Sequence, residues 1–146
     1  MTRKAPPFSL QDTSGKEITL PKKGLVVLYF YPKADTPGCT KESKAFSELY
    51  PQFIEAGALV LGVSPDAHKK ICSFHDKYSF SHELLADPEH TAAEAYGVWT
   101  QKSMFGNKYM GVKRTTFVIK DGKILKEYKH KPGKTEQEVL EYVQEL

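Results

Sequence analysis

Hydrophobic residues follow two different spacings in the first half of the chain. A continuous apolar run from Leu25 to Tyr31, rich in β-branched and aromatic side chains, predicts a buried strand, and the run from Leu59 to Val63 predicts another. Between these runs, apolar residues recur at i, i+3, i+4 and i+7, which is the spacing of one helix face. They are Phe46, Leu49, Tyr50 and Phe53, and the helix is expected to end before Gly57.

Turn and capping residues predict further elements. The stretch from Phe8 to Leu20 holds Asp12-Thr13-Ser14-Gly15-Lys16 between two short extended segments, which predicts an N-terminal hairpin. Ser64-Pro65-Asp66 predicts a second helix with Ser64 as its N-cap and Pro65 at its first position. Asp87-Pro88-Glu89 predicts a third helix in the same way, after a short strand and closed by Gly97.

The C-terminal third carries a strong hairpin signal. Asp121-Gly122 separates the extended runs Thr115 to Ile119 and Lys123 to Tyr128. Thr135 and Glu138 have the spacing of a capping box and predict a last helix. The segment from Gln101 to Gly111 is predicted to be an irregular loop that walls a pocket, and its neighbourhood contains aromatic residues that suit either the core or that wall: Trp99, Phe105 and Tyr109.

This order of elements defines a fold class. Strands that alternate with helices and end in an antiparallel pair predict a mixed central sheet flanked by helices, with the hairpin at its N-terminal end. We therefore expect an α/β protein with a thioredoxin-like fold. A chain of 146 residues, 40% of them hydrophobic, can bury one core, so we expect a single domain over residues 1–146.

Charge and composition exclude several classes of protein. The net charge of +3 comes from 21 basic and 18 acidic residues spread along the chain, so no basic stripe suggests a nucleic-acid partner. The longest apolar run is far shorter than a membrane span of about 18 residues. Because no apolar segment follows the charged N-terminus, we expect a cytoplasmic protein. The five histidines lack metal-ligand spacing, so neither a metal nor a cofactor is expected.

Candidate chemistry centres on Cys39. With Thr36 as N-cap and Pro37 at the first helical position, Cys39 falls at the third position of the helix. A thiolate there can accept first-turn N–H groups and lies at the positive end of the helix dipole, which favours the anion. The alternative is a buried structural thiol.

The helix terminus alone stabilises a Cys39 thiolate too weakly to lower the pKa of the thiol far. Lowering a thiol's pKa from about 8.5 to about 5.5 takes on the order of 4 kcal/mol, so a cation is needed nearby. Arg114, just before the predicted strand from Thr115, can supply it if that strand lies beside the first one; otherwise Arg114 is an ordinary surface residue. Thr36 and the first-turn N–H groups could orient a substrate beside the sulfur, and Tyr31 and Pro32 would wall the pocket.

These residues resemble a known family. Pro32-x-x-x-Thr36-x-x-Cys39 matches the peroxiredoxin active-site motif, and the stretch from Phe30 to Glu42 is similar to the bacterioferritin-comigratory (PrxQ) subfamily. The similarity covers nearly the whole chain and continues through Gly62-Val63-Ser64-Pro65-Asp66, Ala93-Glu94-Ala95-Tyr96-Gly97-Val98-Trp99, Tyr109-Met110-Gly111 and Arg114-x-Thr116-Phe117.

The resemblance implies a thiol peroxidase that reduces hydrogen peroxide and organic hydroperoxides. Cys39 would be the peroxidatic cysteine, with Thr36 and Arg114 as activating partners, Pro32 as its shield and Glu42 as a supporting group. The cycle would pass through a sulfenic acid and end with reduction by thioredoxin or a similar thiol reductant. From the residues alone, Glu42 suits a solvated acid of the first helical turn equally well.

The chain departs from the subfamily at the resolving cysteine. Lys44 and His75 stand where members of the subfamily carry it, and Cys72 precedes His75 by three residues. Cys72 lies about 130° from the centre of the apolar face of the predicted second helix, a face formed by Ala67, Ile71, Phe74 and Tyr78. Cys72 is either an incidental thiol or the resolving residue, and resolution requires local unfolding to bring the two Cα atoms within about 7 Å.

Two other classes of function compete. A thiol-disulfide oxidoreductase needs Cys-x-x-Cys at the helix start, where this chain has Glu42 in the second position. A redox-responsive binding or chaperone module would keep a reactive thiol without turnover, and only an assay with many equivalents of peroxide separates it from a peroxidase. We expect a monomer, with a weak dimer as the alternative.

Overall fold

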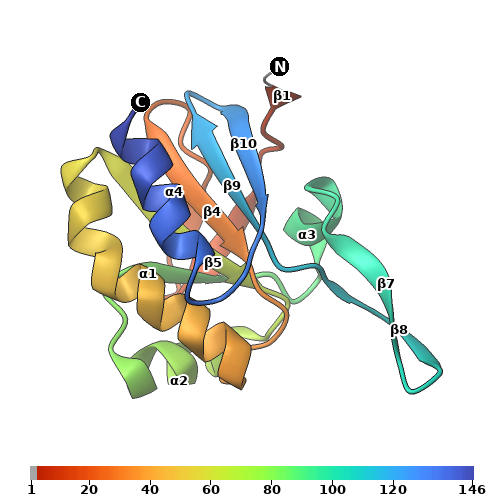
Figure 1. Cartoon of the computed structure of the whole chain (residues 1–146). Helices are drawn as coiled ribbons and strands as arrows, with labels where there is room; N and C mark the ends of the chain where they lie inside the picture. The colour runs from red at the N-terminus through yellow and green to blue at the C-terminus, as the bar shows by residue number, and fades with distance from the viewer. Residues whose placement is uncertain (1–2) are drawn as a thin grey trace.

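A mixed sheet forms the centre of the molecule in the computed structural model, which describes residues 3–146 (Figure 1). Its eight strands follow the order β1-β10-β9-β4-β5-β6-β2-β3. The β4–β5 and β5–β6 pairs are parallel, and the other pairs are antiparallel. These strands are β1 (Arg3–Lys4), β2 (Ser9–Asp12), β3 (Glu17–Thr19), β4 (Leu25–Phe30), β5 (Ala58–Ser64), β6 (Glu83–Ala86), β9 (Thr115–Lys120) and β10 (Lys123–Lys129).

Helices cover both faces of this sheet. One face packs against α1 (Pro37–Glu55), α2 (His68–Tyr78) and α4 (Thr135–Gln144), and the short α3 (Thr91–Ala95) lies on the other. The predicted fold class, an α/β protein with a thioredoxin-like fold, is confirmed. No helix within residues 3–146 is long and apolar enough to cross a membrane.

Strand β4 connects the two halves of the core. Successive side chains of a strand point to opposite faces of the sheet. Val27 and Tyr29 of β4 therefore pack with the cluster under α1, α2 and α4, whereas Val26 and Leu28 pack with the cluster on the α3 side. Because both faces are covered, the run from Val26 to Phe30 is apolar throughout and fully buried.

Several predicted elements are confirmed. The N-terminal hairpin is β2 paired with β3, and α1 contains the predicted apolar face, with Phe46 and Phe53 fully buried. Asp121 and Gly122 join β9 to β10 with φ angles of 50° and 78°. Two successive left-handed residues form the tight turn that matches the twist of a hairpin.

The predicted start of the second helix is wrong. Ser64 belongs to β5, and α2 begins only at His68 with the exposed Ala67 as its N-cap. Asp66 does not cap the helix, because its carboxylate accepts the N–H of Ala34 at 2.7 Å. The residues that predicted a helix cap thus connect the β5–α2 loop to the loop before α1 through a hydrogen bond.

The third and last helices also begin differently from the prediction. The N-cap of α3 is His90, although Asp87 still serves the helix because its carboxylate accepts the N–H groups of Ala92 and Ala93. No capping box forms at α4. There the hydroxyl of Thr135 accepts the N–H of Lys131 at 2.8 Å, and the N-cap residue is Lys134.

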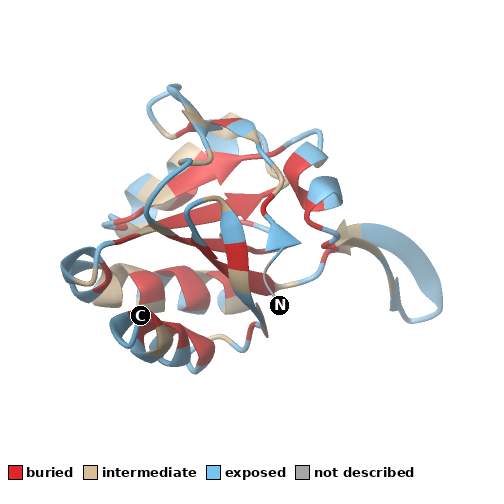
Figure 2. Ribbon diagram, turned by 90° about the horizontal axis from the view of Figure 1, so that it is seen from above, coloured by how far each residue is buried: buried red, intermediate tan, exposed pale blue. Residues whose placement is uncertain are grey.

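The predicted irregular loop from residue 101 to 111 is a second sheet. Strands β7 (Trp99–Met104) and β8 (Asn107–Val112) form a hairpin that projects from the body (Figure 2). Phe105 at its turn is 97% exposed, and Tyr109 is 44% exposed, so neither belongs to the core. Trp99 packs on the core cluster of the α3 side and stacks on His90 at 4.1 Å between ring centroids. The short β1 was not predicted either.

Gly62 is required by the packing of the core. A Cβ at this position of β5 would lie 2.5 Å from Cζ of Tyr29 and 2.9 Å from Cδ2 of Leu84. The Tyr29 ring cannot turn away freely, because its hydroxyl is hydrogen-bonded to Ser43 and His82.

We expect Gly62→Ala to lower the free energy of unfolding by about 1–3 kcal/mol, the usual cost of overpacking a core. Denaturant unfolding monitored by circular dichroism measures this change. Gly111→Ala is the matched control, since its Cβ would meet the flexible Lys102 side chain at 3.3 Å and Cε2 of Tyr109 at an ordinary contact distance of 3.6 Å. Equal stabilities of the two variants would contradict the packing argument.

Candidate active site

Cys39 lies in the first turn of α1. Thr36 is the N-cap of the helix and Pro37 its first residue, so Cys39 is at the predicted third position. Its side chain is fully buried within the core cluster of the helix side. Burial alone also fits a structural thiol, and the charged groups around the sulfur decide between the two readings.

Arg114 supplies the predicted cation. Its Nη2 donates to Sγ of Cys39 at 3.4 Å, and its Nη1 donates to Oε1 of Glu42 at 2.5 Å. The pairing of β9 with β4 explains this placement, because Thr115 lies opposite Phe30 and the loop after β4 leads into α1. A Cβ on Gly38 would come within 3.1 Å of Nη2, so the glycine leaves room for the guanidinium beside the first turn.

Glu42 is a buried carboxyl group rather than a solvated helix acid. Its side chain has no exposed surface, and burial raises its pKa to about 7, although His130 and Arg114 both favour the ionised form. Glu42 is therefore held against the guanidinium that contacts Cys39. A partly exposed arginine that contacts the sulfur and is held by a fully buried carboxyl group is unusual around a structural thiol.

Sequence reasoning missed the groups on the far side of Glu42. Nε2 of His130 lies 3.2 Å from Oε2 of Glu42 and 2.7 Å from Oε2 of Glu136, and Nδ1 of His130 lies 2.6 Å from Oγ1 of Thr116. All four side chains belong to buried residues. They come from α1, β9, the residue after β10 and α4, so no local motif reveals the cluster.

Thr36 and Pro32 flank the first turn at the surface. The hydroxyl of Thr36 donates to the backbone oxygen of Lys33 at 2.9 Å and makes no helix-capping hydrogen bond. Pro32 is half-buried, and the neighbouring Tyr31 is fully buried in the core. Both predicted residues thus lie next to the turn that carries Cys39, with the Thr36 hydroxyl directed back into the loop.

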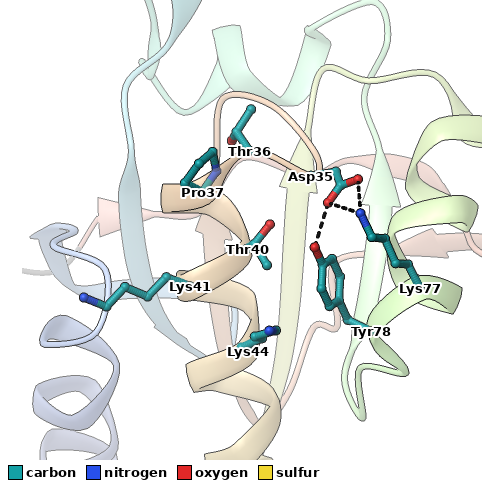
Figure 3. A pocket seen from close by; sticks show the side chains of 8 residues that line it. All are labelled: Asp35, Thr36, Pro37, Thr40, Lys41, Lys44, Lys77 and Tyr78. Carbon is teal, nitrogen blue, oxygen red and sulfur yellow. Dashed lines mark hydrogen bonds and ion pairs between the residues drawn. The ribbon is translucent and has the colours of Figure 1, made fainter.

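A groove of about 510 Å³ lies outside this turn, between α1 and α2 (Figure 3). Asp35 accepts hydrogen bonds from Lys77 at 3.0 Å and from the hydroxyl of Tyr78 at 2.9 Å. Nζ of Lys44 lies 4.8 Å from the centroid of the Tyr78 ring. The residues that line the groove are Asp35, Thr36, Pro37, Thr40, Lys41, Lys44, Lys77 and Tyr78. Its surface is basic, because Asp35 offsets only one of the three lysines.

Comparison with known proteins identifies the family. Residues 1–128 match the model of the AhpC/TSA family. The chain belongs to that family. It is 42% identical to peroxiredoxin Bcp of Bacillus subtilis over 99% of this chain and 92% of the relative, and 41% identical to peroxiredoxin Bcp of Escherichia coli over 82% and 79%.

Solved structures agree with this membership. The structure of Xanthomonas campestris peroxiredoxin Q superposes with a TM-score of 0.89 at 34% identity, over 94% of this chain and 90% of that chain. A structure with the same scores concerns the alkyl peroxide reduction activity of the bacterioferritin comigratory protein of that organism. The resemblance to the PrxQ subfamily is confirmed, and the protein is a peroxiredoxin with thiol peroxidase activity. A redox module without turnover is not favoured.

Cys72 of this peroxiredoxin lies away from Cys39. Its Sγ donates to the backbone oxygen of Thr13 in the β2–β3 turn at 3.2 Å, and burial raises the pKa of its thiol. Both cysteines are free. Cys39 contacts Arg114 beside β9, and four strand steps separate β9 from β2 in the sheet. The two sulfurs thus contact different parts of the molecule, and no disulfide joins them.

Proposed function

We propose that this peroxiredoxin reduces hydrogen peroxide and organic hydroperoxides with Cys39 as the nucleophile. The main evidence is the contact between Arg114 and Cys39. Nη2 of the guanidinium donates to Sγ of Cys39 at 3.4 Å, and Nη1 donates to the carboxyl group of Glu42. A cation at that distance favours the thiolate over the thiol, and the thiolate is the reactive species. The position of Cys39 at the start of α1 adds the helix dipole in the same direction.

The reaction balances as a two-electron transfer. The Cys39 thiolate attacks the terminal oxygen of the hydroperoxide, an S–O bond forms and the O–O bond breaks. Cys39 becomes a sulfenic acid, and the departing alkoxide takes a proton to become an alcohol, or water when the substrate is hydrogen peroxide. The Arg114 guanidinium lies close enough to the sulfur to stabilise negative charge on the departing oxygen as well.

The remaining residues support this step. We infer that Thr36 turns its hydroxyl from the oxygen of Lys33 toward a bound peroxide, a rotation about one side-chain bond. Pro32 would shield the reacting sulfur from bulk water. Because Cys39 is fully buried, substrate reaches the sulfur only after the first turn of α1 or its covering side chains shift.

A dithiol then reduces the sulfenic acid back to the thiol, becoming a disulfide while the oxygen leaves as water. Thioredoxin is the reductant that we propose, with the protein acting in the cytoplasm as a monomer of one domain over residues 1–146. A coupled assay with thioredoxin, thioredoxin reductase and NADPH tests this. We expect many equivalents of peroxide to be consumed per protein, whereas a single equivalent would mean that the protein does not turn over with this reductant.

Resolution of the sulfenic acid is proposed to involve Cys72. We expect one equivalent of peroxide to give a Cys39–Cys72 disulfide and a change in the fluorescence of Trp99, because joining two separated cysteines requires α1 and α2 to unwind locally. Thr40, Lys41 and Lys44 in the first turns of α1 are exposed or half-buried and cost little to release. The same opening must also break the buried contacts of Glu42 with Arg114 and of Ser43 with Tyr29, so the cheap opening expected from the polar run does not hold for these two residues.

The variant Cys72→Ser is then expected to stall as the sulfenic acid and to over-oxidise, as peptide mass mapping under non-reducing conditions would show. If Cys72→Ser instead cycles normally with thioredoxin, and the oxidised unaltered protein contains no linked peptide, the protein is a one-cysteine enzyme and Cys72 is an incidental thiol.

A further inference from the structure

A cluster of two carboxyl groups and one imidazole lies directly behind the Arg114–Cys39 contact. The side chains of Glu42, His130 and Glu136 are 0%, 0% and 1% exposed. They come from α1, the residue after β10 and α4. Charged groups so completely buried are costly unless they are paired, so their arrangement constrains which of them carry protons.

His130 is the best fixed of the three, and Glu136 is one of the groups that hold it. Oε2 of Glu136 lies 2.7 Å from Nε2 of His130 and accepts the N–H of Gly133 at 3.2 Å. The other imidazole nitrogen of His130 lies 2.6 Å from Oγ1 of Thr116. His130 is thus held at both ring nitrogens, and its ring packs against Phe46 with 5.4 Å between centroids.

Glu42 is held on one oxygen only. Its Oε1 accepts from Arg114, whereas its Oε2 lies 3.2 Å from Nε2 of His130 without hydrogen-bond geometry and has no hydrogen-bond partner among residues 3–146. Oε1 of Glu136 also lacks a partner within that part of the chain. Because one imidazole lies within 3.2 Å of both buried carboxyl groups, the charge of Glu42 depends on His130 and Glu136.

We propose that His130 and Glu136 are positioning residues that set the charge of Glu42 and thereby hold Arg114 against Cys39. Neither residue touches the sulfur; the contacts run from His130 to Glu42, from Glu42 to Arg114 and from Arg114 to Cys39. An ionised Glu42 binds the guanidinium with a charge-assisted hydrogen bond, and a protonated Glu42 binds it weakly. The inference rests on the proposed role of Cys39 as the nucleophile.

The two residues act on Glu42 in opposite directions. Burial raises the pKa of Glu42 to about 7; the nearby His130 and Arg114 favour the carboxylate, and the negative charge of Glu136 opposes it. Removing His130 therefore shifts Glu42 toward its protonated form, and neutralising Glu136 shifts it toward the carboxylate. The other titratable side chains that face the cluster are Cys39 on α1, Arg114 before β9, Tyr29 and Tyr31 on and after β4, and Lys41 opposite Gly133.

The test compares His130→Leu with Glu136→Gln. The first removes the imidazole, and the second keeps the shape and an acceptor for His130 but removes the charge. For each variant, the rate of Cys39 alkylation is measured across pH, together with the rate of oxidation by hydrogen peroxide in a single turnover. We expect His130→Leu to move the pH midpoint of alkylation upward by about one unit and to slow oxidation at pH 7 about tenfold. Glu136→Gln should move the pH midpoint of alkylation downward, so that the rate of oxidation by peroxide stays high at lower pH than in the unaltered protein.

A packing control separates positioning from general damage. Val139→Ala loosens the buried side of α4 and replaces neither carboxyl group. It should lose about as much thermal stability as the cluster variants and leave the pH midpoint of Cys39 alkylation unchanged. His130→Gln keeps an N–H donor in place of Nε2 and should recover part of the rate. Shifts of both cluster variants in the same direction, or no shift in the near-isosteric Glu136→Gln, would overturn the inference. These outcomes can be told apart from a failure of the proposed function, in which the unaltered protein itself would not react with peroxide at Cys39.

Discussion

Replacing Cys39 by serine is expected to remove peroxide turnover almost completely, by about 10³-fold or more. The hydroxyl of serine has a far higher pKa than a thiol, so the Arg114 guanidinium and the start of α1 cannot ionise it. The substitution changes one buried atom and should leave the fold intact, which circular dichroism and the unfolding midpoint verify.

Turnover is measured as peroxide consumed in the presence of thioredoxin and its reductase. In a single turnover with one equivalent of peroxide and no reductant, Cys72→Ser is the matched control, because it removes the other thiol of the chain and leaves the surroundings of Cys39 unchanged. It is expected to react with the first equivalent of peroxide at the normal rate. A Cys39→Ser protein that keeps more than a few per cent of the turnover would show that the nucleophile lies elsewhere.

Arg114→Ala is expected to produce the second largest loss, about 100-fold in the rate of peroxide attack on Cys39. The variant removes the donor to the sulfur and leaves Glu42 buried without its cationic partner. The pH midpoint of Cys39 alkylation should move upward in the same variant, because the thiolate loses its nearest cation. A parallel change in both quantities is the signature of an arginine that acts on the thiolate itself.

The appropriate control is Lys113→Ala, which removes a positive charge from the exposed neighbour of Arg114. Its effect on the rate should be small, since screened surface charges contribute little. Arg114→Lys keeps the charge but cannot bridge Glu42 and Cys39 with two nitrogens, so it should lie between the unaltered protein and Arg114→Ala. If Arg114→Ala changes neither the rate nor the midpoint, Arg114 is an ordinary residue at the start of β9.

Elements with a strong local signal could be predicted from the sequence. The apolar run of β4 and the i, i+3, i+4, i+7 face of α1 are consequences of burial, and the Asp121-Gly122 turn follows from backbone conformations that few residues adopt. Thr36 and Pro37 placed the start of α1, and so Cys39, at the observed position. The proximity of Arg114 followed once β9 was taken to lie beside β4.

The errors arise where a local signal is used for another purpose. Ser64-Pro65-Asp66 has the composition of a helix start, yet Asp66 binds the N–H of Ala34 in the loop after the neighbouring strand β4, which no local pattern reveals. The β7–β8 hairpin was missed because most residues of its strands are exposed, and its turn uses Phe105 with a φ of 52° instead of the usual Asn or Asp. The cluster of His130 with Glu42 and Glu136 joins residues from distant parts of the chain, so only the folded arrangement shows it.

The central claim is that Cys39 is the atom oxidised by peroxide, and peptide mass mapping after one equivalent of hydrogen peroxide tests it most directly. The reaction is quenched with a reagent that traps sulfenic acid, and digestion is carried out under non-reducing conditions. The account predicts that the oxidised sulfur is found at Cys39, as the trapped sulfenic acid or in a disulfide that includes Cys39. Oxidation confined to Cys72 or to methionine, with the Cys39 thiol intact, would contradict it.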